Sequence, residues 1–217
     1  MNLKNFHTAL AFAANASAEK DVRYYLHGVA VDFAHAEKRA DSTMILVGTD
    51  GTRMNRICLK VDKKDFPTLP RTGSPIILDA KAVAAILAIK KPSEHVDIDL
   101  ILSNDIFTES KLAKFCTFVA DSLTIRCDLI DGKFPDYRRV IPKIPDPVAE
   151  AVGVDSDKLV ASAKAYSTLG KAAGRKYRKC VMTCSGANNA IRFVGDAEWM
   201  NDQEDIHSPE IVLMPMR

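Results

Sequence analysis

Residues 129–147 read LIDGKFPDYRRVIPKIPDP, and this stretch divides the chain into two parts. Three prolines stand at short intervals near its end: Pro142, Pro145 and Pro147. Proline fixes φ and has no backbone N–H to donate, so this spacing is typical of an extended linker rather than of a helix or a strand. We therefore expect two domains, residues 1–142 and residues 143–217.

On both sides of the linker, a helical pattern precedes several strand patterns. Apolar residues at helical spacing predict three helices: residues 2–16, 79–89 and 157–169. Asp79 is the expected N-cap of the second helix, and Asp155 or Ser156 that of the third. The unit of one helix and several strands recurs after roughly 75 residues, which indicates an internal structural repeat.

The strand patterns favour antiparallel pairing. β-branched and aromatic runs predict strands over the following residues: 22–33, 44–47, 53–61, 76–78, 95–102, 114–119, 122–130, 152–154, 179–185, 189–195 and 211–214. Asp50-Gly51 marks a tight turn, so the strands on either side of it form a hairpin. We expect an α+β fold in which helices cover one face of antiparallel sheets.

The composition is that of a folded protein without a membrane span. Of the 217 residues, 47% are hydrophobic and 27% are charged, which excludes an intrinsically disordered chain. No run of 18 or more apolar residues occurs, and the first residues lack the basic-then-apolar order of a signal peptide. We expect a cytoplasmic protein that does not associate with membranes.

The cysteines predict reduced thiols rather than a disulfide framework or a metal site. There are five: Cys58, Cys116, Cys127, Cys180 and Cys184. An odd number in a chain of this length argues against a disulfide framework. Cys180 and Cys184 are close in sequence, but no second pair completes the four ligands of a zinc site. We expect no bound metal.

No catalytic constellation is visible. The sequence has no phosphate-binding loop, no nucleophile elbow and no His-Glu-x-x-His pattern, and its five histidines are scattered. Asp97 and Asp99 would share one face of a strand, but no base or third ligand accompanies them. We expect neither catalytic residues nor a cofactor.

One segment carries charge of a single sign. Residues 158–179 contain seven basic residues and no acidic one: Lys158, Lys164, Lys171, Arg175, Lys176, Arg178 and Lys179. Such a segment in a chain of net charge +2 is either a contact surface for a polyanion or a solvated face. The sequence pattern leaves both interpretations open.

Four stretches give the sequence its resemblance. Residues 21–28 (DVRYYLHG) and 48–54 (GTDGTRM) resemble the start of the middle domain of the bacterial sliding clamp, the β subunit of DNA polymerase III. Residues 129–142 resemble that family's crossing from the middle domain to the last, and residues 212–217 (VLMPMR) its C-terminal tail. Against the usual three-domain chain, this sequence looks like a shortened form without the first domain and part of the last.

The resemblance implies a ring that encircles duplex DNA without reading its sequence and tethers a polymerase to it. Contacts to the phosphates would come from basic residues and from a loop with two tyrosines. The residues that match are Arg23, Tyr24, Tyr25, Lys81, Lys90, Lys164, Lys171, Arg175 and Lys176. For at least one of the tyrosines, packing in a strand is the alternative. A ring also implies a homo-oligomer, associated with the nucleoid.

The resemblance further implies a pocket for short linear peptides of DNA polymerase, the clamp loader and repair proteins. Its walls would come from all four stretches: Leu26, Thr49, Gly51, Arg53, Met54, Pro135, Arg139, Val140, Val212, Met214, Pro215 and Met216. Leu26 and Val140 would form an apolar floor, and methionine side chains adapt to varied ligands. For Met214 and Met216 alone, core packing is the alternative. Thr52 stands where the family has histidine.

Two other functions compete with a ring-forming processivity factor. A peptide-binding adaptor or decoy would keep the pocket without closing a ring, and would compete with a host clamp for its partners. A DNA-modifying enzyme is disfavoured by the absence of catalytic motifs. Retention on circular DNA separates the first two functions, because only a closed ring is trapped topologically.

Overall fold

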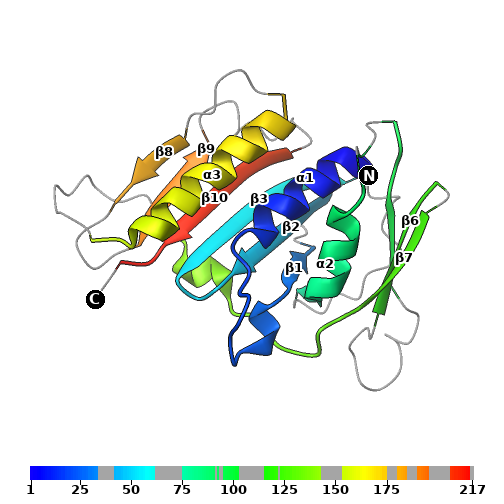
Figure 1. Cartoon of the computed structure of the whole chain (residues 1–217), viewed down its shortest axis with the longest axis horizontal. Helices are drawn as coiled ribbons and strands as arrows, with labels where there is room; N and C mark the ends of the chain where they lie inside the picture. The colour runs from blue at the N-terminus through cyan, green and yellow to red at the C-terminus, as the bar shows by residue number, and fades with distance from the viewer. Residues whose placement is uncertain are drawn as a thin grey trace.

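The computed structural model describes residues 1–33, 42–61, 75–90, 92, 95–102, 115–121, 123–142, 153–174, 180–184, 190–195 and 206–215. Figure 1 shows the α-helices in these ranges: α1 (Leu3–Ala14), α2 (Ala80–Leu87) and α3 (Ser156–Ala172). Short 3₁₀ helices are η1 (Tyr24–Leu26) and η4 (Tyr137–Val140). None of the described helices has both the length and the apolar composition to span a membrane.

The larger sheet of the described residues has seven strands in the order β4-β1-β2-β3-β10-β9-β8. The strands are β1 (Val29–Asp32), β2 (Ser42–Thr49), β3 (Arg53–Val61), β4 (Ile76–Leu78), β8 (Cys180–Thr183), β9 (Ile191–Gly195) and β10 (Ile206–Leu213). Each neighbouring pair is antiparallel. Because β10 pairs with β3, one continuous sheet contains strands from both sides of the linker.

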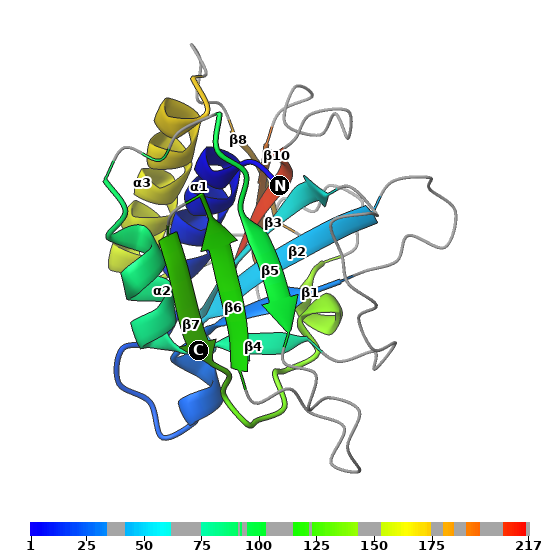
Figure 2. The same cartoon turned by 90° about the vertical axis from the view of Figure 1, so that its right-hand side faces the viewer.

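A second, three-stranded antiparallel sheet has the order β5-β6-β7. Its strands are β5 (Asp99–Leu102), β6 (Phe115–Ala120) and β7 (Leu123–Asp128). Alternate residues of β6 are buried, which gives this sheet one inner face. In Figure 2 it faces the viewer, with α2 beside β7. The α+β fold class with antiparallel sheets is therefore confirmed.

Helix α1 occupies the centre of the main core. The side chain of Asn2 caps it by accepting a hydrogen bond from the backbone N–H of Asn5 at 3.0 Å. Phe6 meets Phe118 of β6 with ring centroids 5.3 Å apart, and Phe12 meets Tyr166 of α3 at 5.7 Å. Helix α1 thus packs on β2 and β3 and also joins the smaller sheet and α3 to that core.

The opposite face of the larger sheet carries a second apolar cluster. Residues of alternating strand positions, such as Ala30, Met54 and Val212, pack there beneath Phe134 and Tyr137. Those two aromatic side chains come from the stretch 129–142, which therefore covers the sheet face that the helices leave open. This second face holds the candidate site.

Most predicted elements agree with the structure, although the strand expected over 95–102 begins only at Asp99 and the strand expected over 211–214 begins earlier, at Ile206. The strand expected over 22–33 is wrong at its start, where Val22 is exposed and residues 24–26 form η1. Local bonds such as Leu26 N–H to the Arg23 carbonyl replace a ladder there, and pairing begins only at Val29. The strand expected over 152–154 is also wrong in its described part, because Gly153 and Val154 lie outside any strand.

Candidate functional site

A cavity of about 210 Å³ opens on the second sheet face, beside the β2–β3 turn and the end of β10. We call it the junction pocket, because its walls come from both sides of the linker. Its lining residues are Arg23, Leu26, Thr49, Gly51, Thr52, Arg53, Met54, Pro135, Asp136, Tyr137, Val140, Val212 and Met214. The stretches around η1, the β2–β3 turn, η4 and β10 therefore converge at one place.

The structure brings most of the predicted wall residues together. Nine of them line the junction pocket: Leu26, Thr49, Gly51, Arg53, Met54, Pro135, Val140, Val212 and Met214. Arg139 and Pro215 are described but do not line it, and Met216 lies outside the described residues.

Sequence reasoning missed four of the lining residues. Thr52, Asp136 and Tyr137 lie inside the quoted stretches, so adjacency to predicted wall residues was the available signal. Arg23 was assigned to DNA contact, yet it lines the junction pocket. The sequence alone does not show that such a side chain lines a cavity, because the cavity forms only where segments distant in the chain come together.

The bottom of the junction pocket is apolar and its mouth is partly open to solvent. Leu26, Met54 and Val212 are buried at the bottom. Val140 is 36% exposed and Met214 is 38% exposed, so these two belong to the mouth rather than to the floor. A site of this kind suits an apolar side chain of a ligand, which loses contact with water as it enters.

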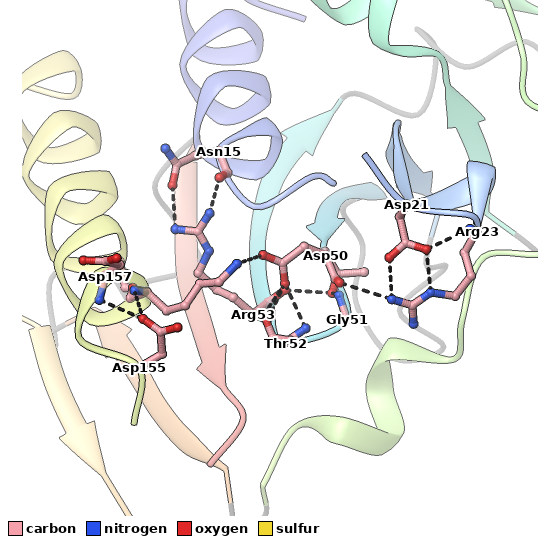
Figure 3. Close-up of polar contacts among 12 residues, drawn as sticks. Asn15, Asp21, Arg23, Asp50, Gly51, Thr52, Arg53, Asp155 and Asp157 are labelled. Carbon is pink, nitrogen blue, oxygen red and sulfur yellow. Dashed lines mark hydrogen bonds and ion pairs between the residues drawn. The ribbon is translucent and has the colours of Figure 1, made fainter. Parts of the chain in front are cut away.

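The β2–β3 turn holds its shape through its own side chains (Figure 3). The Asp50 carboxylate accepts the backbone N–H groups of Thr52 and Arg53, both at 2.8 Å. Thr49 accepts the Gly51 N–H at 3.0 Å and donates its hydroxyl to the Arg53 carbonyl at 2.7 Å. Gly51 has φ of 86°, a left-handed conformation that favours glycine. The turn is therefore a rigid wall.

Two cations fasten this wall to neighbouring helices. Arg53, which is buried, donates to the side-chain and backbone oxygens of Asn15 at the end of α1 (Figure 3). Lys158, in the first turn of α3, places Nζ 2.5 Å from Asp50 Oδ2. Burial alone would raise the pKa of Asp50, but hydrogen bonds from Lys158, Thr52 and Arg53 outweigh burial and lower it. Lys158, the first residue of the basic segment 158–179, thus forms an ion pair within the chain.

Arg23 forms the neighbouring wall through an ion pair of its own. Its guanidinium donates to both carboxylate oxygens of Asp21, at 2.9 and 2.7 Å, and to the Asp50 carbonyl at 3.3 Å. The hydrogen bonds from Arg23 lower the pKa of Asp21 to about 2. Tyr24, next in sequence, is 55% exposed and donates its hydroxyl to the Asp131 carbonyl. Tyr25 is half-buried, and its ring contacts the ring of Tyr24.

A buried carboxylate positions η4, the wall that carries Tyr137 and Val140. Asp32 of β1 accepts hydrogen bonds from the Tyr137 hydroxyl at 2.7 Å and from Arg138 Nη2 at 2.5 Å. Burial and the bond to Asp32 both raise the pKa of Tyr137, so the phenol stays protonated. The stretch 129–142 is therefore tied to the sheet by polar as well as apolar contacts.

A second buried carboxylate holds β10, the wall that carries Val212. Glu210 is 3% exposed and accepts a hydrogen bond from Arg192 of β9. Its other oxygen lies 3.5 Å from Arg56 Nη1 on β3. One carboxylate thus links the two strands between which β10 lies.

Among the described basic residues expected to contact DNA, Lys81, Lys164 and Lys171 lie on α-helices. Lys81 and Lys90 are exposed at the start of α2 and just after it. Lys164 and Lys171 are exposed on α3, two helical turns apart and so on one side of that helix. Arg175 and Lys176 lie outside the described residues. Within the described ranges, no group of three or more histidine, cysteine or acidic residues could hold a metal ion.

Comparisons with known proteins agree with this arrangement. Residues 1–136 match the family model described as DNA polymerase III beta subunit, central domain. A beta sliding clamp of Salmonella typhimurium is 33% identical over 134 residues, which cover 62% of this chain and 31% of that protein. One from Rickettsia bellii is 29% identical over 196 residues, covering 87% of this chain and 43% of that protein.

Solved structures extend the likeness to the whole chain. A DNA polymerase sliding clamp from Pseudomonas aeruginosa, with a ligand, is similar over 100% of this chain and 65% of its own, at a TM-score of 0.67 and 18% identity. A sliding clamp from Bartonella birtlesii, bound to griselimycin, gives a TM-score of 0.63 at 18% identity. At this identity the likeness shows the fold. The chain thus spans a third to two-thirds of the proteins that it matches.

Proposed function

This chain belongs to the family of the DNA polymerase III β subunit, and on that premise we propose that it is a sliding-clamp-like processivity factor. In this role it surrounds or contacts duplex DNA without sequence preference and binds clamp-motif peptides of DNA polymerase, the clamp loader and repair proteins. The family is non-enzymatic, and the proposed role needs no catalytic residue or cofactor. The proposed location is the cytoplasm, at the nucleoid, and the proposed state is a homo-oligomer.

The junction pocket is the observation that carries this proposal. An apolar bottom, a methionine at the mouth and two arginines in the walls form a site for a short peptide with apolar side chains. Rigid walls favour binding, because less side-chain and loop entropy is lost when the ligand enters.

Shortening the side chains at the mouth is expected to weaken peptide binding. Met214→Ala should raise the Kd of a clamp-motif peptide about tenfold, and the double variant with Val140→Ala about a hundredfold, since each truncation removes roughly 1.4 kcal/mol of apolar contact. Both side chains are exposed enough to leave the fold intact. The measurement is fluorescence anisotropy with a labelled peptide from the clamp-binding segment of a bacterial polymerase.

Met182→Ala is the matched control, because Met182 is also exposed but lies on β8, outside the lining of the junction pocket. It should leave the Kd unchanged. Equal affinities for Met214→Ala and the parent chain would contradict the assignment of this pocket.

The exposed lysines of α3 are expected to govern retention on DNA. The double variant Lys164→Glu with Lys171→Glu should reduce the amount of protein retained on nicked circular DNA. Because two phosphate contacts are lost, the plot of log K against log salt should also become less steep by about 2. Lys133→Glu, an exposed lysine in the stretch that covers the second sheet face, is the control. Unchanged retention would leave these lysines as a solvated face.

The same DNA separates the ring from the second candidate, a peptide-binding adaptor or decoy that competes with a host clamp. The residues that line the junction pocket come together within this chain, and this makes the adaptor the second candidate. Loss of the retained protein when the circle is linearised indicates a closed ring. Peptide binding by a monomer that circular DNA does not retain indicates the adaptor.

A further inference from the structure

Cys116 of β6 and Cys127 of β7 lie directly opposite each other in the smaller sheet. Both side chains are buried and belong to the inner face, beneath the main core (Figure 2 shows the two strands side by side). Residues directly opposite in antiparallel strands have Cα atoms about 4.5–5.5 Å apart. Disulfides are found at Cα separations of about 4.4–6.8 Å. The backbone therefore already has the spacing that a disulfide needs.

The two thiols are in contact. A hydrogen bond between them, together with burial, raises the pKa of Cys116, and the same bond lowers the pKa of Cys127. Cys127 is therefore the thiol that loses its proton first, and Cys116 stabilises the thiolate that results. In thiol–disulfide exchange the thiolate is the attacking species.

In the strand registers of the described residues, no other cysteine stands opposite a cysteine. Cys58 on β3 stands opposite Ile45 on β2 and His207 on β10. Cys180 on β8 stands opposite Gly195 of β9, and Cys184 follows the end of β8. All five cysteines fall within the described residues, so the pair at 116 and 127 is distinct among them.

Strand β7 offers a route of access to the pair. In the part of the chain that the structure describes, β7 is the outer strand of its sheet, and Leu123 at its start is 39% exposed. An outer strand opens locally at a lower free-energy cost than a central one, because it breaks hydrogen bonds on one side only. Opening of β7 presents Cys127 to a small disulfide in solution.

We propose that Cys116 and Cys127 are a modification site, a dithiol that a small-molecule disulfide such as glutathione disulfide oxidises to an intrachain disulfide. The Cys127 thiolate, its proton given to solvent, attacks one sulfur of glutathione disulfide, and one glutathione leaves as a thiolate that takes up a proton. Cys116 then loses its proton and attacks Cys127 Sγ of the mixed disulfide, which releases the second glutathione. Two protein thiols are oxidised, and one glutathione disulfide is reduced to two thiols.

The product would connect β6 to β7 covalently beside the first turn of α2. Asp79, the N-cap of α2, acts on both thiols electrostatically, and α2 packs on β7. Oxidation therefore suppresses opening of β7, the strand on which α2 packs. It thereby stabilises the position of α2, the helix that carries Lys81.

The test is oxidation of the full chain by glutathione disulfide, followed by alkylation and peptide mapping by mass spectrometry. We expect one cross-linked peptide that joins Cys116 to Cys127, and a rise in Tm of about 5–10 °C that a reductant reverses, because the bond closes a short loop of the unfolded chain. Cys127→Ser and Cys116→Ser should each abolish both effects, and Cys180→Ser, at an exposed cysteine, should abolish neither.

Peptide mapping of the unmutated chain tests the proposed disulfide even if a serine variant folds poorly. Recovery of alkylated Cys116 and Cys127 after oxidation has gone to completion would overturn the proposal. So would a disulfide that joins either residue to another cysteine in the folded chain. The readout does not involve DNA or peptide binding, so it is independent of the proposed processivity function.

Discussion

Replacing Glu210 with alanine is expected to lower the free energy of unfolding by about 3–5 kcal/mol, because it leaves the partners of a buried carboxylate without their counter-charge. Arg192 and Arg56 both face Glu210, and their side chains are only 19% and 20% exposed. The Nε of Arg56 has no hydrogen-bond partner among the described residues. Urea denaturation followed by circular dichroism measures the change.

Two comparisons make this result specific. Asp128→Ala removes an exposed carboxylate from β7 and should change the free energy by less than about 0.5 kcal/mol. Peptide affinity should fall together with stability in Glu210→Ala, because β10 carries Val212 and leads to Met214 of the junction pocket. A loss below 1 kcal/mol would mean that water replaces the carboxylate readily.

The second large effect is expected from Gly48→Ala, with a loss of about 3 kcal/mol from overpacking. A Cβ at Gly48 would lie 2.1 Å from the carbonyl oxygen of Ala13 and 2.9 Å from its carbonyl carbon. These are backbone atoms of α1, so no rotation of a side chain relieves the clash, and the helix has to move away from β2. The midpoint of urea unfolding should fall accordingly.

Gly153→Ala is the matched control for this change. A Cβ at Gly153 would meet nothing within 4 Å, and its φ does not lie in the left-handed region. Because alanine restricts the unfolded chain more than glycine does, this variant should be neutral or slightly stabilising. Similar free energies of unfolding for Gly48→Ala and Gly153→Ala would contradict the prediction, because they would show that α1 moves away at Ala13 with little cost.

Local signals were sufficient to predict several elements of the fold. Asp79 and Asp155 each accept a backbone N–H of the first turn of the following helix, as their positions before α2 and α3 indicated. Asp50-Gly51 correctly placed the hairpin of β2 and β3. These patterns succeed because caps and tight turns depend on residues that are close in sequence.

Long-range features had no comparable signal. The pairing of β10 with β3 and the contact of Lys158 with Asp50 join residues that are far apart in the chain. An alternating pattern identifies a strand without identifying its neighbour. The resemblance to sliding clamps predicts the convergence of the pocket walls, whereas the role of Arg23 in a wall and the partners of the buried Glu210 are visible only in the structure.

The position of β10 in the sheet has a consequence for protein synthesis. This strand, made by the ribosome after all the other described strands, lies between β3 and β9 rather than at an edge. While β10 is still inside the ribosome, β3 and β9 have no strand between them. Val212 and Met214 are then absent from the junction pocket. Peptide binding at the junction pocket, if it occurs as proposed, would therefore begin only after β10 has joined the sheet.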